Sequence, residues 1–173
     1  MKYICAIDPS NTKSAFVICE ADSLKPIRFA KLQNELMFPE IINALFTLSY
    51  TMTGCEYAIE DIENFGGIVG RSVFDTCKWI GRIEERLDLS GIKYTEIKRS
   101  QERKTICPGI RNPKDTNIRH ALIERFAPYE SNMGKGTKKN PGWFYGFHAD
   151  IWQAYAVAVT YHDLKKAGEL KNE

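Results

Sequence analysis

The chain has 173 residues, of which 43% are hydrophobic and 27% are charged, and its formal net charge at pH 7 is +2. This length and composition predict one globular domain spanning residues 1–173, large enough to bury a substantial core. No run of about 18 apolar residues is present to span a membrane, and the first residues lack the pattern of a secretory signal. We therefore expect a cytoplasmic protein with no membrane partner.

The five cysteines are scattered along the chain, odd in number, and never arranged as C-x-x-C. This pattern argues against both a disulfide framework and a zinc ribbon. We expect free thiols, most of them buried, since cysteine in an apolar run behaves as a small hydrophobic residue.

Basic residues are concentrated in one part of the chain. Between Lys93 and Lys139 there are twelve Lys and Arg against five Asp and Glu, whereas the remainder is net acidic. A one-sided distribution of this kind is expected of a protein that binds a phosphate backbone. On charge alone, a solvated charged face explains it equally well.

The first part of the chain predicts a β-hairpin followed by a helix. Residues 3–10 and 13–22 are two apolar, β-branched segments separated by a Pro-Ser-Asn turn signal. Residues 25–33 can supply a third strand. Apolar residues at helical spacing then predict a helix at 38–52, with Pro39 near its start, where proline is tolerated.

Strands and helices alternate in the middle of the chain. Residues 56–62 form a short apolar segment typical of a buried strand, residues 72–87 have helical spacing, and residues 92–98 predict a returning strand. A further helix is expected at 114–126, with Asp115 as its candidate N-cap.

The last part of the chain contains a loop and a long helix. Residues 129–143 are rich in Gly, Lys and Asn, and residues 150–168 predict a helix with lysines in its last turns. This order of elements predicts an α/β fold, in which a mixed sheet of five strands carries helices on both faces.

Three carboxylates lie at the edge of the expected core. Asp8 ends the apolar run "YICAI", Glu60 ends "YAI", and Asp150 opens a helix whose next turns, "AYAVAV", are apolar nearly all round. Carboxylates gathered so closely repel one another, and hard divalent cations take oxygen ligands. The pattern therefore favours a divalent-metal site.

Each of these acids also has an ordinary structural explanation. Asp8 precedes Pro9 and can be a turn residue, and Glu60 can belong to a solvated strand end. Asp150 fits a capping box, in which it caps the last helix while Gln153 reaches back to the cap.

Several motifs occur in a characteristic order along the chain. The strand "AIDPS" is followed by "AIEDI", by the helix "FDTCKWIGRIEERL", and by a C-terminal helix that opens on an acid before "QAYAVAV". Between the second and third acids lie a Lys-Thr pair, a Gly-Ile turn and a further Lys, namely Lys104, Thr105, Gly109, Ile110 and Lys114. Together these motifs resemble the RuvC-like Holliday junction resolvases, whose fold is the ribonuclease H type shared with retroviral integrases.

The resemblance implies a site for two Mg²⁺ or Mn²⁺ ions. Asp8, Glu60 and Asp150 match the catalytic, metal-binding acids of the family. Gln153 stands where the family commonly has a second ligand three residues into the helix, and its amide offers an oxygen but no charge. His148 is a candidate to compensate, and Asp61 is a weaker one because neighbours on a strand point to opposite faces.

The basic segment and two loops supply candidate DNA contacts. Lys104 and Lys114 match lysines of the family, and Phe65 is a candidate stacking wedge. The lysines of the 129–143 loop lie beside aromatic residues, a mixture suited to contacts with phosphates and bases. The alternative interpretation is that these aromatic residues are buried in the core. The full set of candidate DNA-binding residues is Lys98, Arg99, Arg103, Lys104, Arg111, Lys114, Phe65, Lys135, Lys138 and Lys139.

The function implied by the resemblance is a crossover junction endodeoxyribonuclease. Such an enzyme resolves branched DNA by paired phosphodiester hydrolysis, needs no nucleotide cofactor, and acts as a homodimer. The helix at 74–87 is the candidate dimer face, although Trp79 and Ile83 on it can equally pack in the core. The alternatives are a branched-DNA-binding protein of the same fold that does not cut, and a ribonuclease H acting on RNA–DNA hybrids. Compact chains of this kind are also similar to phage-encoded resolvases.

Overall fold

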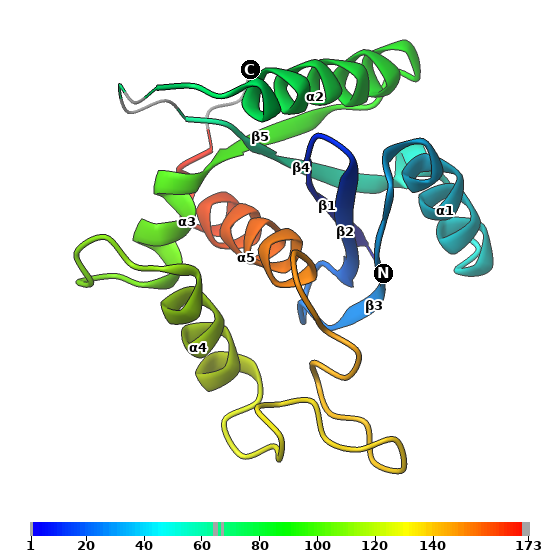
Figure 1. Cartoon of the computed structure of the whole chain (residues 1–173). Coiled ribbons are helices and arrows are strands. Elements are labelled where there is room, and N and C mark those ends of the chain that lie inside the picture. The colour runs from blue at the N-terminus through cyan, green and yellow to red at the C-terminus, as the bar shows by residue number, and fades with distance from the viewer. Residues whose placement is uncertain (1, 64–65, 67, 171–173) are drawn as a thin grey trace.

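One mixed sheet of five strands organises the structure, a computed structural model that describes residues 2–63, 66 and 68–170 (Figure 1). The strands lie in the order β3-β2-β1-β4-β5, with β1 antiparallel to β2 and parallel to β4. β2 and β3 are antiparallel, whereas β4 and β5 are parallel. The strand bounds are β1 (Tyr3–Asp8), β2 (Lys13–Glu20), β3 (Pro26–Gln33), β4 (Cys55–Asp61) and β5 (Tyr94–Lys98). The mixed five-stranded sheet expected from the sequence is confirmed.

Helices cover both faces of the sheet, as expected (Figure 1). Two of them pack on one face together with the turn that precedes β4, and three lie on the other. The first two are α1 (Asn34–Thr47) and α2 (Arg71–Leu89), and the other three are α3 (Arg99–Ile106), α4 (Asp115–Phe126) and α5 (Ile151–Ala167). The turn is a short 3₁₀ segment, η1 (Met52–Gly54).

Two helices differ from the sequence-based expectation. α3 was not expected, because its sequence is almost entirely polar and has no apolar periodicity from which a helix could be inferred. α1 begins earlier than predicted, at Asn34. The buried Asn34 side chain accepts a hydrogen bond from Ser14 Oγ at 2.8 Å and donates one to the Ser10 carbonyl at 2.9 Å. These bonds fix the start of the helix against the β1–β2 turn.

The central strand β1 separates two cores. Ile4 and Ala6 face α5, whereas Cys5 and Ile7 face α1 and α2. This alternation follows from the two-residue period of a strand. Asp8 continues the series that faces α5, and Glu60 does the same on β4 two residues after Ala58. Both acids therefore project towards the helix that was predicted to supply the third.

α5 is buried over most of its length, as its uniformly apolar sequence predicted. On the opposite face, Ile83 of α2 is fully buried, and Trp79 packs against the same core. The core-packing explanation of these two residues is therefore confirmed. The cysteines are free as expected, and Cys77 alone among them is exposed. Within the described part of the chain, no helix has the length and apolar character needed to cross a membrane.

A pair of carboxyl groups links α2 to the edge strand β5. Glu84 and Glu96 lie within hydrogen-bonding distance of each other, and burial together with the Glu96 carboxyl raises the pKa of Glu84 from 4.5 to about 7. The folded protein thus holds this proton more tightly than the unfolded chain does. The pair therefore stabilises the fold most at low pH, and this contribution is lost as the pH rises from about 4.5 to about 7.

We expect Glu84→Gln to reduce the fall in stability between about pH 5 and about pH 8, because glutamine keeps hydrogen-bonding groups but does not titrate there. The measurement is the urea midpoint of unfolding at the two pH values. Glu85→Gln, at an exposed position of the same helix, is the matched control. Equal pH dependence in the Glu84 variant and the wild type would contradict the assignment.

Candidate functional site

The sheet places two acids side by side at the ends of adjacent parallel strands. Asp8 and Glu60 each follow the paired residues Ile7 and Ile59 of β1 and β4. Both side chains are partly buried. Parallel pairing in this register puts acids 52 positions apart in the sequence at the same depth of the sheet.

Burial and the neighbouring acids strongly perturb Asp8. Burial, followed by the neighbouring Glu60 carboxyl, raises the pKa of Asp8 well above its usual range. Asp150 and Glu102 add smaller contributions of the same sign. The acids predicted from the sequence are thus brought into one electrostatic cluster, together with a fourth acid that the sequence did not reveal.

Asp150 stands at the start of α5, next to a strained backbone position. Ala149 has φ of +43°, a left-handed conformation that is unfavourable for a residue with a Cβ atom. Asp150 occupies the N-cap position, but its side chain makes no capping hydrogen bond and forms an ion pair with Lys31 of β3. Gln153 does not reach back to the cap either. The capping-box interpretation of this pair is therefore wrong.

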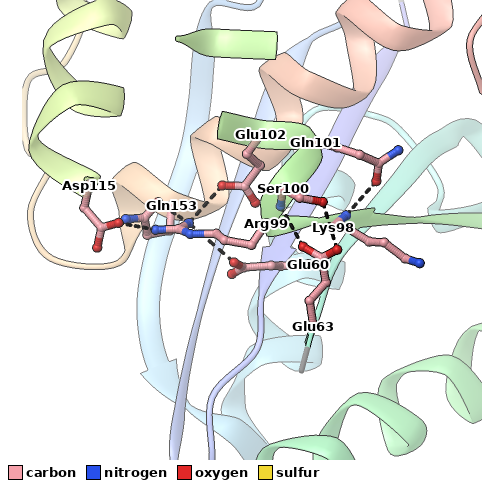
Figure 2. Close-up of polar contacts among 9 residues, drawn as sticks. All are labelled: Glu60, Glu63, Lys98, Arg99, Ser100, Gln101, Glu102, Asp115 and Gln153. Carbon is pink, nitrogen blue, oxygen red and sulfur yellow. Dashed lines mark hydrogen bonds and ion pairs between the residues drawn. The ribbon is translucent and has the colours of Figure 1, made fainter. Parts of the chain in front are cut away.

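Arg99, at the first position of α3, links the acids to α5 (Figure 2). Its Nη1 donates to Gln153 Oε1 at 2.6 Å and to Glu102 Oε2 at 2.8 Å, and it lies 3.4 Å from Glu60 Oε1. Its Nη2 donates to Asp115 at the start of α4. One guanidinium thus joins the acid cluster to three helices.

Glu102 is the site residue that sequence analysis missed. Its side chain is fully buried, and burial followed by the charge of Glu60 raises its pKa well above the usual range, while Arg99 opposes this shift. Its Oε1 atom has no hydrogen-bond partner among the described residues. A glutamate in a polar run resembles a solvated helix face, so its sequence neighbours offered no signal.

A loop acid anchors the start of α3. Glu63 accepts hydrogen bonds from the Ser100 backbone N–H at 2.7 Å and from Ser100 Oγ at 2.8 Å (Figure 2). The carboxylate satisfies donors at a helix N-terminus, where negative charge is favoured. This contact ties the chain that follows β4 to the helix that carries Arg99.

The candidate DNA-binding residues do not form a single cluster. Lys98, Lys104, Arg111 and Lys114 are exposed along the segment from β5 to the start of α4, whereas Arg103 is partly buried. Phe65 lies outside the described residues. The lysines of the last loop, Lys135, Lys138 and Lys139, follow the other end of α4, whose twelve residues span about 18 Å.

Two aromatic residues at the end of that loop, Trp143 and Phe144, pack against the core, whereas Tyr145 is 43% exposed. Phe144 is fully buried, and Trp143 stacks on Phe126 with ring centroids 5.4 Å apart. Trp143 Nε1 also donates to the Tyr155 hydroxyl at 3.0 Å. Gly134, with φ of +77°, lies so close to Phe144 that a Cβ atom would be 2.7 Å from the ring. The explanation of Trp143 and Phe144 as core aromatics is therefore confirmed.

Comparison with solved structures identifies the fold. A structure of T. thermophilus RuvC in complex with a Holliday junction substrate aligns with a TM-score of 0.67 and 9% sequence identity, and the alignment covers 99% of both chains. A second Thermus thermophilus RuvC structure aligns with a TM-score of 0.67 and 10% identity over 98% of both chains. The chain therefore has a RuvC-like fold of the ribonuclease H type, as the sequence motifs predicted. No protein-family model and no curated protein sequence matches it.

Arg99 is expected to be essential for the stability of the site. Replacing it with methionine leaves Glu60, Glu102 and Asp115 without their shared cation, and we expect the free energy of unfolding to fall by about 2–4 kcal/mol. The measurement is urea denaturation at neutral pH. Arg28→Met removes an ion pair to Glu40 whose arginine side chain is 55% exposed, so this control should lose about 1 kcal/mol or less. Equal losses in the two variants would argue against a buried cation at the site.

Proposed function

We propose that the protein is a divalent-metal-dependent endodeoxyribonuclease that cuts branched DNA, with four-way junctions as its preferred substrate. The observation that carries this proposal is the pairing of Asp8 with Glu60 on adjacent strand ends, with Asp150 in electrostatic range. The fold supports it, since one of the similar solved structures is of RuvC in complex with a Holliday junction substrate.

The chemistry of the acid pair fits a magnesium or manganese ion. No three His, Cys, Asp or Glu residues in the described part of the chain are grouped closely enough to hold a metal as they stand. Mg²⁺, however, is usually held by one or two carboxylates and completes its shell with waters and substrate phosphate. Glu60 helps to raise the pKa of Asp8, and a cation between the two carboxylates would relieve their repulsion. Asp150 is the candidate third ligand.

The proposed reaction is hydrolysis of a phosphodiester bond. A divalent ion bound there would lower the pKa of a bound water and stabilise charge on the phosphate. The water oxygen forms a bond to phosphorus, the bond from phosphorus to the 3′ oxygen breaks, and the leaving oxygen takes up a proton. The products are a 3′ hydroxyl and a 5′ phosphate. Arg99 and Lys31, on either side of the acids, are placed to attract the phosphate group.

The basic segment supplies the proposed DNA-binding surface. Its exposed members follow β5 and α3 to the start of α4, where Lys114 lies beside Asp115, a partner of Arg99. A four-way junction has two-fold symmetry, so paired nicks require a homodimer. α2 remains the proposed dimer face, through exposed residues such as Phe74 and Leu89 rather than through the buried Ile83.

A non-cleaving junction-binding protein is the main alternative. It is favoured by one observation, namely that both α5 positions expected to bind metal are engaged by cationic side chains. Incubating a labelled four-way junction with excess protein and Mg²⁺ or Mn²⁺ separates the two functions. Binding without nicks would reject the nuclease. A parallel assay on an RNA–DNA hybrid tests the ribonuclease H alternative.

Asp8→Asn should abolish cleavage while leaving junction affinity nearly unchanged. Loss of groups that merely orient metal ligands lowers activity by about 10–100-fold, so loss of a ligand should lower it by about 100-fold or more. The measurements are single-turnover cleavage and gel-shift affinity for the same junction. Retention of activity in this variant would remove Asp8 from the proposed centre.

Lys114→Ala should weaken junction binding and reduce the slope of log affinity against log salt by about 1, because one phosphate contact is lost. Lys166→Ala, at an exposed position near the C-terminal end of α5, is the control and should leave the slope unchanged. An unchanged slope for Lys114→Ala would place the DNA elsewhere on the surface.

A further inference from the structure

Cationic side chains of the protein contact both residues at the start of α5 that the RuvC resemblance assigns as metal ligands. Asp150 pairs with Lys31, and Gln153 accepts a hydrogen bond from Arg99 at 2.6 Å. We propose that this centre holds a single divalent ion, and that the Arg99 guanidinium, positioned by Gln153 and Glu102, supplies the second positive charge to the DNA phosphate. This inference rests on the proposed nuclease function and specifies its cation content.

Arg99 is held far more firmly than an ordinary surface arginine. Its guanidinium has acceptors from Glu60, Glu102, Gln153 and Asp115, which come from β4, α3, α5 and α4, and only 18% of the side chain is exposed (Figure 2). An arginine with several fixed acceptors loses little further freedom when it acts as a cation. Arg99 is therefore a fixed positive charge of the folded protein.

A second ion at position 153 would have to displace Arg99. The amide oxygen of Gln153 carries no charge to compete for a divalent cation, and it is already used by Nη1. Displacement would also leave Glu102 without its cation in a fully buried position, where one of its oxygens already lacks a partner among the described residues. Removing one partner from a buried ion pair is strongly destabilising. The neutral Gln153 and the fixed position of Arg99 therefore depend on each other.

Lys31 differs from Arg99 in how easily it can leave. It contacts Asp150 at a site where the two side chains are 28% and 37% exposed, and it lies on a flexible four-carbon stem. The register Asp8–Ala15–Lys31 places it two strands away from Asp8 on the same face of the sheet. Asp150 can thus be released to join Asp8 and Glu60 around one ion, whereas Gln153 remains with Arg99.

The guanidinium has the geometry for the role proposed. Nη1 and Nη2 already donate to protein acceptors, so the guanidinium acts as a fixed positive charge near the reacting phosphorus, where it stabilises the charge that develops during hydrolysis. Nη1 lies 3.4 Å from Glu60 Oε1, so the guanidinium borders the Asp8–Glu60 pair directly. A phosphate held by an ion at that pair would meet Arg99 as its next neighbour.

The test counts Mn²⁺ ions bound per chain, with and without an intact four-way junction, by electron paramagnetic resonance titration of the 173-residue chain. We expect one ion for the wild type. Gln153→Asp alone should also bind one, because the new carboxylate pairs with Arg99. Arg99→Met combined with Gln153→Asp should bind two, and Arg28→Met should match the wild type.

The outcomes separate this inference from the function on which it rests. Two ions in the wild type or in Gln153→Asp, or a single ion in the folded double variant, would overturn the role assigned to Arg99 and leave the nuclease proposal intact. Folding of the double variant is checked by its urea unfolding transition. If no Mn²⁺ binds to the wild type in either state, the metal-dependent function itself is rejected.

Discussion

The site depends on the repulsion between carboxylates that the sheet forces together. Parallel pairing of β1 and β4 places Asp8 beside Glu60, and α3 adds the fully buried Glu102. Burial and proximity raise the pKa values of Asp8 and Glu102, so their ionised forms are tolerated only with cations close by. Arg99 and Lys31 are the cations the chain itself provides, and Arg99 links α3 to α4 and α5.

The burial of α5 makes this arrangement rigid. A helix that is apolar nearly all round can lie only between the sheet and other helices, and its start carries Asp150 and Gln153 to the ends of β1 and β4. The aromatic residues of the preceding loop fix the same end, with Phe144 and Phe147 packed against Trp152. The polar site is thus positioned by apolar packing on the neighbouring turn of the helix.

The sequence predicted those parts of the site that local patterns encode. Asp8 and Glu60 end apolar strands, and Asp150 opens an apolar helix, so each stood out against its neighbours. The partner of Gln153 could not be predicted, because Arg99 is 54 residues away and lies in a polar helix without periodicity. Lys31 was equally hidden, since its relation to Asp150 depends on the register of three strands. Ordered motifs were sufficient for the fold, but the cations that balance the acids are a property of tertiary structure.

The contrast between Arg99 and Lys31 gives the acids distinct roles. Glu102 and Asp115 hold Arg99 in place, and neither shares an ion pair with Lys31 among the described contacts. Glu60 borders both the guanidinium and Asp8, so it is the one acid that belongs to both the fixed cation and the proposed metal position. A neutral residue at position 153 is then an advantage. An acid at position 153 would add negative charge to a cluster in which carboxylates already outnumber cationic side chains. The amide oxygen of Gln153 orients Arg99 without adding repulsion.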